Sequence, residues 1–252
     1  MLATRVIPSV LLRGQQLVKG QQFQSWRSIG HAAQAAYIYA ARECDEIILL
    51  DIAATPEGRG PDFEMVRLWT ENTFSPMTVG GGVRSVEEVR ELLRCGADKV
   101  AICTGAHEVL GLIHESSERF GAQAIVAAID VREGCAFSHC GQKRLFGGNM
   151  DSYDVKLWAS IMASAGAGEI LLTSIDREGM LQGYDLDLIK AVSDAVSIPV
   201  IAHGGCGTYE HMVEAIEAGA HAVAAGAMFA FTDQTPKGAS QYLLEHGIHA
   251  RV

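Results

Sequence analysis

The sequence predicts a single (β/α)₈ barrel, or TIM barrel, that spans residues 1–252. Eight short apolar segments of strand type alternate with helical patterns along the chain. The second half of the sequence repeats the first at an offset of 123 residues, as in a barrel built from two like halves. The length of 252 residues is typical of one such barrel and is sufficient for a large core.

The strands are predicted from runs of aliphatic residues bounded by glycine, proline or polar residues. They are expected at residues 5–11, 46–52, 76–80, 98–103, 123–130, 169–174, 199–203 and 222–227. Helical patterns fall between them and at residues 236–246. Parallel strands buried on both faces favour such continuous apolar runs, and apolar residues make up 48% of the chain.

The segment from Pro76 to Thr104 illustrates the repeating unit. An apolar strand ends at three successive glycines, residues 80–82, and Ser85 is a suitable N-cap for the helix that follows. Gly96 ends this helix before the next strand begins. The apolar face of the helix is expected to consist of Val86, Val89, Leu92 and Leu93. The unit is therefore strand, glycine turn, helix, strand.

Two glycine turns related by the repeat predict two anion sites. Glycine turns at strand ends expose backbone N–H groups, and the helix that follows adds a partial positive charge; the alternative is a tight turn that merely requires glycine. One site is expected to consist of Gly81, Gly82 and Thr104, and the other of Gly204, Gly205, Gly226 and Ala227. In a barrel both face one mouth, which implies a ligand with a phosphate at each end.

Lys19 lies in residues 12–20, after the first strand, where we expect a mobile loop. From this position its side chain can close over a phosphorylated ligand; the alternative is a solvated surface lysine. The longest irregular segment is expected at residues 132–150, after the fifth strand. Active-site lids commonly lie on such loops at the carboxyl side of a barrel strand.

Asp130, at the end of the fifth strand, is the main catalytic candidate. A carboxylate there points into the barrel mouth and can act as a general acid or base; the alternative is an aspartate that caps the next turn. The first strand aligns with the fifth at an offset of 119, which places Leu11 at the position equivalent to Asp130. Chemistry that needs an acid and a base across the barrel would require a carboxylate at both. The other polar candidates at strand ends are Asp51, Thr78, Thr173, Asp176 and Glu178. His203 precedes the second glycine pair and is a candidate donor to a phosphate.

Four charged residues are predicted to meet at the amino-terminal end of the barrel. Arg5, Glu46, Lys99 and Glu169 begin strands one, two, four and six, and strand alternation turns them inward. Buried charges are costly unless paired, and two positive and two negative charges balance. They form either a structural plug or the gate of a narrow path, because several inward positions above them are small. These positions are Ser9, Ala101, Ala124, Ala128 and Ala224.

Composition excludes several classes of function. The net charge of −10 argues against nucleic acid or an anionic membrane as a partner. No apolar run is long enough to span a membrane, and the first strand begins too early for a signal peptide. The six cysteines show no C-x-x-C spacing and are expected to be reduced thiols in a cytoplasmic protein. The nine histidines lack metal-ligand spacing, so no metal is expected.

Several motifs resemble the cyclase subunit of imidazole glycerol phosphate synthase over nearly the whole chain. They are MLATRVIP, LVKG, DEIILLDI, TVGGGV, GADKV, VAAID, GAGEILLTSIDREG, GYD and the final glycine pair. The resemblance implies a barrel without a cofactor that takes ammonia from a glutaminase subunit docked on its amino-terminal face. The ammonia reacts at the far end with a bisphosphorylated ribonucleotide, giving imidazole glycerol phosphate and an aminoimidazole carboxamide ribotide.

The resemblance also assigns residue roles. It makes Arg5, Glu46, Lys99 and Glu169 an ammonia gate, and Asp98 a residue that helps to dock the glutaminase. Other positions kept from the family are Lys19, Asp51, Gly82, Thr104, Asp130, Thr173 and Gly205.

The departures from the family cluster at the chemistry. Leu11 replaces one aspartate of the catalytic pair, Cys103 replaces the asparagine of an N-T pair, and Glu178 stands third in the D-R-D-G motif. This pattern resembles a divergent branch in surface-polysaccharide pathways, in which the barrel conducts ammonia and a third enzyme aminates an acetamido sugar. A genuine cyclase of histidine biosynthesis is the alternative. The sister isomerase or a purely phosphate-binding barrel ranks last, because the isomerase also needs a first-strand carboxylate and needs no gate.

Overall fold

A computed structural model describes residues 3–42, 44–145 and 155–251. Eight parallel strands form a closed barrel: β1 (Arg5–Arg13), β4 (Ile47–Asp51), β5 (Met77–Gly80), β6 (Lys99–Ile102), β7 (Ile125–Arg132), β10 (Glu169–Ser174), β11 (Val200–His203) and β12 (Ala222–Ala225). Pairing of β7 with β10 and of β12 with β1 closes the sheet. The predicted fold class is confirmed, and each predicted strand end lies within two residues of the observed one.

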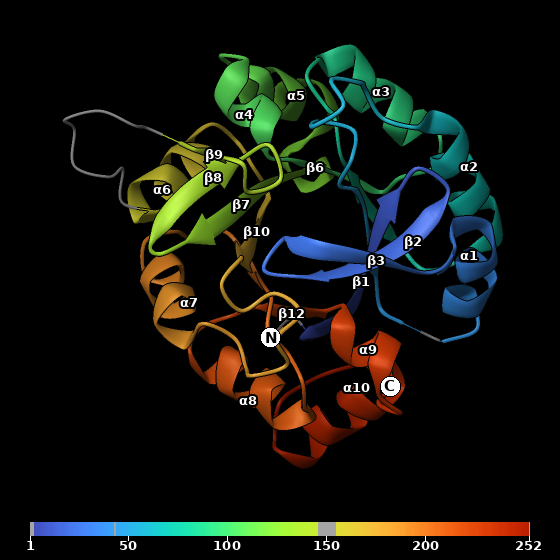
Figure 1. Cartoon of the computed structure of the whole chain (residues 1–252). Helices are drawn as coiled ribbons and strands as arrows, with labels where there is room; N and C mark the ends of the chain where they lie inside the picture. Colours follow the sequence, from blue (N-terminus) through green and yellow to red (C-terminus); the bar gives the residue numbers. More distant parts are fainter. Residues whose placement is uncertain (1–2, 43, 146–154, 252) are drawn as a thin grey trace.

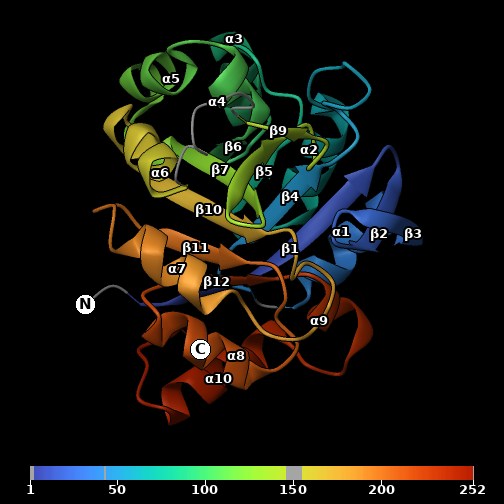
Figure 2. The same cartoon turned by 60° about the vertical axis from the view of Figure 1, so that its left-hand side comes forward.

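Helices surround the barrel (Figure 1, Figure 2). They are α1 (Ala32–Ala40), α2 (Phe63–Asn72), α3 (Val86–Arg94), α4 (Thr104–Glu108), α5 (Leu112–Phe120), α6 (Val155–Ser164), α7 (Leu186–Ser193), α8 (Tyr209–Glu217), α9 (Ala227–Phe231) and α10 (Pro236–Glu245), with a short 3₁₀ turn, η1 (Ala122–Ala124). Ser85 caps α3 in a capping box, as predicted. The short helices α4 and α9 begin at Thr104 and Ala227, which are separated by the repeat offset of 123.

Two hairpins cross the mouth of the barrel, where we predicted loops. The first consists of β2 (Gln16–Gln21) and β3 (Gln24–His31), and the second of β8 (Cys135–Ser138) and β9 (Lys143–Arg144) (Figure 1). The prediction of a loop at residues 12–20 is therefore wrong. The strand β1 continues to Arg13 and turns back into β2 through Gly14 and Gln15, with Gly14 in the left-handed conformation that a two-residue hairpin favours.

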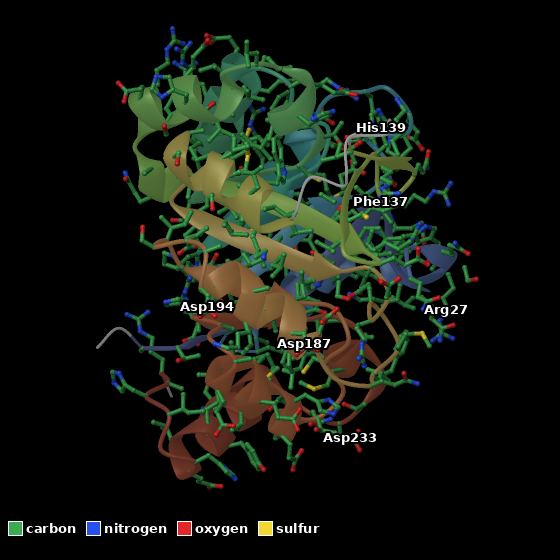
Figure 3. All side chains as sticks on the ribbon, turned by 90° about the vertical axis from the view of Figure 1, so that its left-hand side faces the viewer. Arg27, Phe137, His139, Asp187, Asp194 and Asp233 are labelled. Carbon is green, nitrogen blue, oxygen red and sulfur yellow. The ribbon has the colours of Figure 1, made fainter. Side chains whose placement is uncertain are left out.

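The predicted irregular segment at residues 132–150 is also corrected. Antiparallel pairing of Val131 with Ala136 extends β7 into β8, and β9 pairs with β8 in turn. Residues 146–150 of that prediction lie outside the described residues. Both hairpins lie at the same end of the barrel, where Figure 3 labels Arg27, Phe137 and His139.

The glycine turns require glycine for close packing as well as for backbone conformation. Gly81 and Gly205 have φ angles of 119° and 100°. A Cβ atom at Gly205 would lie 2.2 Å from the carbonyl oxygen of Gly183, and one at Gly81 would lie 2.4 Å from that of Asp51. One glycine of each turn is therefore in close contact with the backbone of a neighbouring segment, Gly81 with Asp51 and Gly205 with Gly183.

The apolar core has two parts, separated by the sheet. The larger lies between the barrel strands and the surrounding helices. The smaller fills the barrel interior with Ile7, Ile48, Ala101, Val126, Leu171, Ile201, Ala222 and Ala224. Ala124, which we predicted to face inward, instead packs in the outer core, because it lies in the turn η1 before β7 begins. None of the helices in the described ranges is long and apolar enough to cross a membrane.

Candidate functional site

The four predicted charges form a closed ring at the amino ends of the strands, here called the charged ring (Arg5, Glu46, Lys99 and Glu169). Arg5 lies 2.6 Å from Glu46 and 2.8 Å from Glu169, measured between nitrogen and carboxylate oxygen. The Lys99 ammonium lies 3.0 Å from both carboxylates. Each cation therefore contacts both anions. This confirms the prediction that the four side chains turn inward from the strand ends and meet.

Glu46 is the most deeply buried member of the charged ring, with 2% of its surface exposed. The hydroxyl of Thr78 also donates to it, at 2.6 Å, so Thr78 lies beside the charged ring and not at the carboxyl end of its strand, where we predicted it. Burial alone would raise the pKa of Glu46, but the charges of Lys99 and Arg5 and these hydrogen bonds together lower it below its ordinary value. Glu46 is therefore ionised and is the point on which both cations converge.

The barrel interior directly above the charged ring is largely apolar, and Ser9 is a polar residue within it. Ser9 is completely buried on β1, and alternation places it between Ile7 of the interior core and Leu11 at the mouth. Its hydroxyl has no hydrogen-bond partner among the described residues. A buried hydroxyl without a partner is unfavourable, so this position calls for a functional explanation.

A cavity of about 90 Å³ lies at the opposite end of the barrel, beneath the two hairpins. It is lined by residues at the carboxyl ends of several strands, among them Leu11, Asp51, Gly81, Gly82, Cys103, Thr104, Asp130, Thr173 and His203. Phe23 of the β2–β3 hairpin and Cys140 beyond β8 cover it. Sites for drug-sized ligands usually measure about 300–1,000 Å³. With both hairpins in this position, the cavity holds only a small group.

Asp130 is the titratable centre of this mouth cavity. Its carboxylate lies 3.6 Å from the Cys103 thiol. Burial raises the pKa of Asp130 to about 7, although hydrogen bonds from Cys103 and Thr173 act in the opposite direction. An acid whose pKa lies near neutrality can both donate and accept a proton, which suits general acid–base chemistry.

The two thiols of the mouth cavity are poor nucleophiles. Burial and the nearby Asp130 raise the pKa of Cys103 well above its ordinary value, and that of Cys140 to about 12. Because the thiolate is the reactive form, neither residue is suited to covalent catalysis here. Sequence reasoning missed Cys140, which has no distinguishing motif and reaches the cavity only through the β8–β9 hairpin.

The first predicted anion site, Gly81, Gly82 and Thr104, borders the mouth cavity as expected. The hydroxyl of Thr104 already accepts a hydrogen bond from the backbone N–H of His139, at 2.9 Å. The β8–β9 hairpin is thus attached to the residue that was predicted to hold a phosphate.

Lys19 lies against the second predicted anion site and is not a solvated surface residue. Only 1% of its surface is exposed, and its ammonium donates to the carbonyl oxygen of Ser9 at 2.8 Å. A Cβ atom at Gly226 would lie 2.2 Å from this nitrogen. Burial lowers the pKa of Lys19 to about 8, while Glu178 favours the charged form. The remaining members, Gly204, Gly205 and Ala227, are buried nearby in the fold and are absent from the lining of the mouth cavity.

Glu178 and His203 form a buried pair beside Lys19. The Nε2 atom of His203 lies 3.8 Å from the Glu178 carboxylate, and its Nδ1 atom lies 3.1 Å from the Thr173 hydroxyl. Burial lowers the pKa of His203, so that the ring is neutral near neutral pH. Glu178 is thus a partner of Lys19 and His203 beneath the mouth.

Three other predicted residues have structural partners. Arg59 contacts Asp51 at 2.6 and 3.0 Å, and the same carboxylate caps the turn at Ala53. Asp176 accepts from the backbone N–H of Glu133 at 2.8 Å, which fastens the β10 loop to the β7–β8 turn. Asp98 accepts from the backbone N–H of Met77 at 2.8 Å, at the amino end of β5. Within the described part of the chain, no three His, Cys, Asp or Glu side chains come together as a metal site.

The raised pKa of Asp130 predicts a pH-dependent stability. Between about pH 4 and 7 the unfolded chain ionises this carboxyl while the folded chain keeps it protonated, so stability falls as pH rises through that window. Asp130→Asn removes this contribution. We expect its stability relative to the unmodified protein to increase from pH 4 to 7 and then to stay level, measured by urea unfolding. Asp194→Asn, at an exposed site on the end of α7, is the control. The prediction is contradicted if the stability of Asp130→Asn changes with pH in parallel with that of the unmodified protein.

Residues 5–235 match the model of a protein family described as histidine biosynthesis protein. The match begins with the first residue of β1 and ends at Thr235, the N-cap of α10. It therefore covers the whole barrel, including the charged ring, both glycine turns and Asp130.

Proposed function

We propose that this chain, which belongs to the histidine biosynthesis protein family, is the barrel subunit of a glutamine amidotransferase assembly. In this assembly a glutaminase subunit docks on the amino-terminal face and releases ammonia into the barrel. The ammonia passes the charged ring and leaves at the mouth, where an acceptor is aminated.

The observation that carries the proposal is the contrast between the two ends of the barrel. At the amino end the charged ring is complete, and all four side chains are engaged. At the mouth one of the two expected acids is missing, because Leu11 lines the cavity that holds Asp130. A ring of charges is costly inside a barrel, where apolar residues are often at least as stable, so its presence favours a use over a structural role.

Three further features support the route. Ser9 offers an unpaired hydroxyl between the charged ring and the mouth, to which ammonia can hydrogen-bond in passing. Asp130, with a pKa near neutrality, can exchange a proton with ammonia on arrival. Phe74 is completely exposed just before β5, so the amino-terminal face carries an apolar group suited to an interface.

The acceptor we favour is an acetamido sugar that a third enzyme converts to an acetamidino sugar in surface-polysaccharide biosynthesis. This choice rests on Leu11, since a conduit needs no second catalytic acid. The alternative is a genuine imidazole glycerol phosphate synthase cyclase of histidine biosynthesis. Asp130 and the intact turn of Gly81 and Gly82 at the mouth favour that alternative.

The test is to combine the protein with the glutaminase encoded beside it and to measure binding, glutamine hydrolysis and acceptor amination. A stable interface should bury about 1,200–2,000 Å² in total. Lys99→Ala opens the charged ring without changing the exposed face, so we expect docking and hydrolysis to persist while acceptor amination per glutamine hydrolysed falls well below one.

Lys190→Ala is the matched control, because Lys190 pairs with Asp194 on the exposed surface of α7. It should leave binding and coupling unchanged. If no glutaminase binds, or if Lys99→Ala transfers ammonia as efficiently as the unmodified chain, the charged ring is only a structural plug.

A further inference from the structure

A second cavity, of about 480 Å³, lies above the mouth cavity and is here called the vestibule. It is lined by Arg13, Phe23, Gln24, Trp26, Ile52, Ala53, Pro56, Glu57, Arg132, Cys140, Gly141 and Gln142. Phe23, Ile52 and Cys140 also line the mouth cavity, so the two spaces adjoin. The volume of the vestibule falls within the range of small-molecule sites, about 300–1,000 Å³.

Two arginines face the vestibule from repeat-related positions. Arg13 and Arg132 lie two residues beyond Leu11 and Asp130 on β1 and β7, at the same offset of 119. Strand alternation therefore places them one inward layer above that pair. The two strands thus extend past the catalytic layer and present a guanidinium on each side of the mouth.

Neither guanidinium group is neutralised by a carboxylate in the described part of the chain, although that of Arg132 lies 5.2 Å above the centre of the Phe137 ring. Arg132 donates to two carbonyl oxygens, those of Gly141 and Gln22, each at 3.2 Å. Arg13 is exposed and makes no ion pair with a carboxylate in the described part of the chain. The single carboxylate of the vestibule, Glu57, is held by Arg59 at 2.8 Å. A positive site on a chain of net charge −10 favours an anionic ligand.

An aromatic platform completes the vestibule. Phe23 and Trp26 lie with their ring centroids 6.2 Å apart on the β2–β3 hairpin. The Trp26 ring packs across the backbone of Gly20, where a Cβ atom would lie 2.6 Å from it, and the ring is only half-buried. Its orientation is therefore fixed before any ligand arrives, which lowers the entropic cost of stacking.

We propose that the vestibule binds a nucleotide, with the base stacked on Trp26 and the phosphates between Arg13 and Arg132. Planar guanidinium groups bind phosphate in a bidentate way, and aromatic rings stack on bases. The site differs from the two glycine turns, which lie deeper at the strand ends. It is independent of the ammonia route, since equilibrium binding requires neither glutaminase nor transfer.

The experiment uses Trp26 as its own reporter. Of the three tryptophans, Trp69 and Trp158 are buried, with 0% and 8% of their surface exposed. Stacking of a base on Trp26 should therefore quench the fluorescence that is accessible to solvent. Uridine diphosphate and adenosine diphosphate are the probes, and ribose 5-phosphate and the free nucleosides each lack one half of the ligand. We expect both diphosphates to quench the fluorescence of Trp26. Calorimetry should show that ribose 5-phosphate and the free nucleosides bind more weakly than the diphosphates.

Arg13→Gln should weaken diphosphate binding about tenfold or more, the usual effect of losing a charged hydrogen bond. Arg27→Gln is the matched control, because Arg27 lies on the same hairpin but stacks on Phe231, outside the vestibule. Trp26→Leu should abolish the quenching and weaken binding. The proposal is overturned if neither diphosphate binds at millimolar concentration, or if Arg13→Gln binds as tightly as the unmodified protein. The second result would assign the phosphates to the glycine turns.

Discussion

The unmodified protein, supplied with the bisphosphorylated ribonucleotide and an ammonium salt, is expected to show turnover far below the 1 s⁻¹ or so of ordinary enzymes. The cyclase to which the sequence is similar uses an aspartate on the first strand and another on the fifth. Here Leu11 occupies the first position and lines the cavity that holds Asp130. One acid–base group typically contributes about 10²–10⁴ in rate, and imidazole product formation measures the loss.

Asp130 cannot replace the missing partner by titration alone. With a pKa of about 7 it is divided between its two forms near neutral pH, but one carboxyl cannot give and take a proton in the same step. The Cys103 and Cys140 thiols do not substitute, because burial and Asp130 keep them protonated. The buried His203 lies beside Thr173 and Glu178, on the side of Lys19.

Leu11→Asp tests this account by gain of function, with Leu11→Asn as the control of equal size that carries no acid. Of these two variants, we expect only Leu11→Asp to raise the rate. Its rate should remain below that of an ordinary cyclase, because Cys103 and Glu178 also depart from the cyclase motifs. Turnover of about 1 s⁻¹ or more by the unmodified chain would show that Leu11 is not limiting. An equal gain from Leu11→Asn would show that polarity, not acid–base chemistry, was missing.

The barrel and the charged ring were predictable from sequence because both depend on the periodic spacing of residues along the strands. A strand has a repeat of two, so the first residue of each strand fixes which later residues face inward. Arg5 and Lys99 therefore had to meet Glu46 and Glu169 once the sheet closed. The glycine turns were predictable for a similar reason, since the offset of 123 relates Gly81 to Gly204 and Gly82 to Gly205.

The mouth was less predictable because it depends on contacts between distant segments. The short sequence around Lys19 gave no sign that its ammonium would be buried against Gly226. Phe23, Cys140 and the arginines of the vestibule reach the mouth only because β1 and β7 extend into hairpins. A glycine-containing turn such as Gly14–Gln15 is the one local signal that could have indicated the first hairpin.

Glu46→Ala is expected to lower the free energy of unfolding by about 3–5 kcal/mol, the usual cost of removing one partner of a buried ion pair. Both Arg5 and Lys99 would lose their nearest buried carboxylate, and the Thr78 hydroxyl would lose its acceptor. Urea unfolding at neutral pH measures the change. Glu87→Ala is the control, because Glu87 is exposed and each of its surface pairs, with Arg90 and with Arg119, should contribute at most about 1 kcal/mol.

The pH dependence gives an independent check. The folded pKa of Glu46 is lowered below its ordinary 4.5, so its contribution is fully present above that value and is lost as pH falls through the folded pKa. The stability difference between the unmodified protein and Glu46→Gln should therefore shrink in acid. A difference that stays constant down to the acid limit of folding would mean that the ion pairs add little.

Removing one cation and one anion together separates stability from use. Glu46→Leu combined with Lys99→Met leaves Arg5 paired with Glu169 and fills the vacated space with apolar groups. Such replacements are often neutral or stabilising, so we expect this double variant to be at least about as stable as the unmodified protein, and far more stable than Glu46→Ala. If the charged ring serves transfer, the double variant should still bind the glutaminase yet lose coupling between hydrolysis and amination. A double variant that folds, docks and couples fully would show that the charges serve neither stability nor transfer.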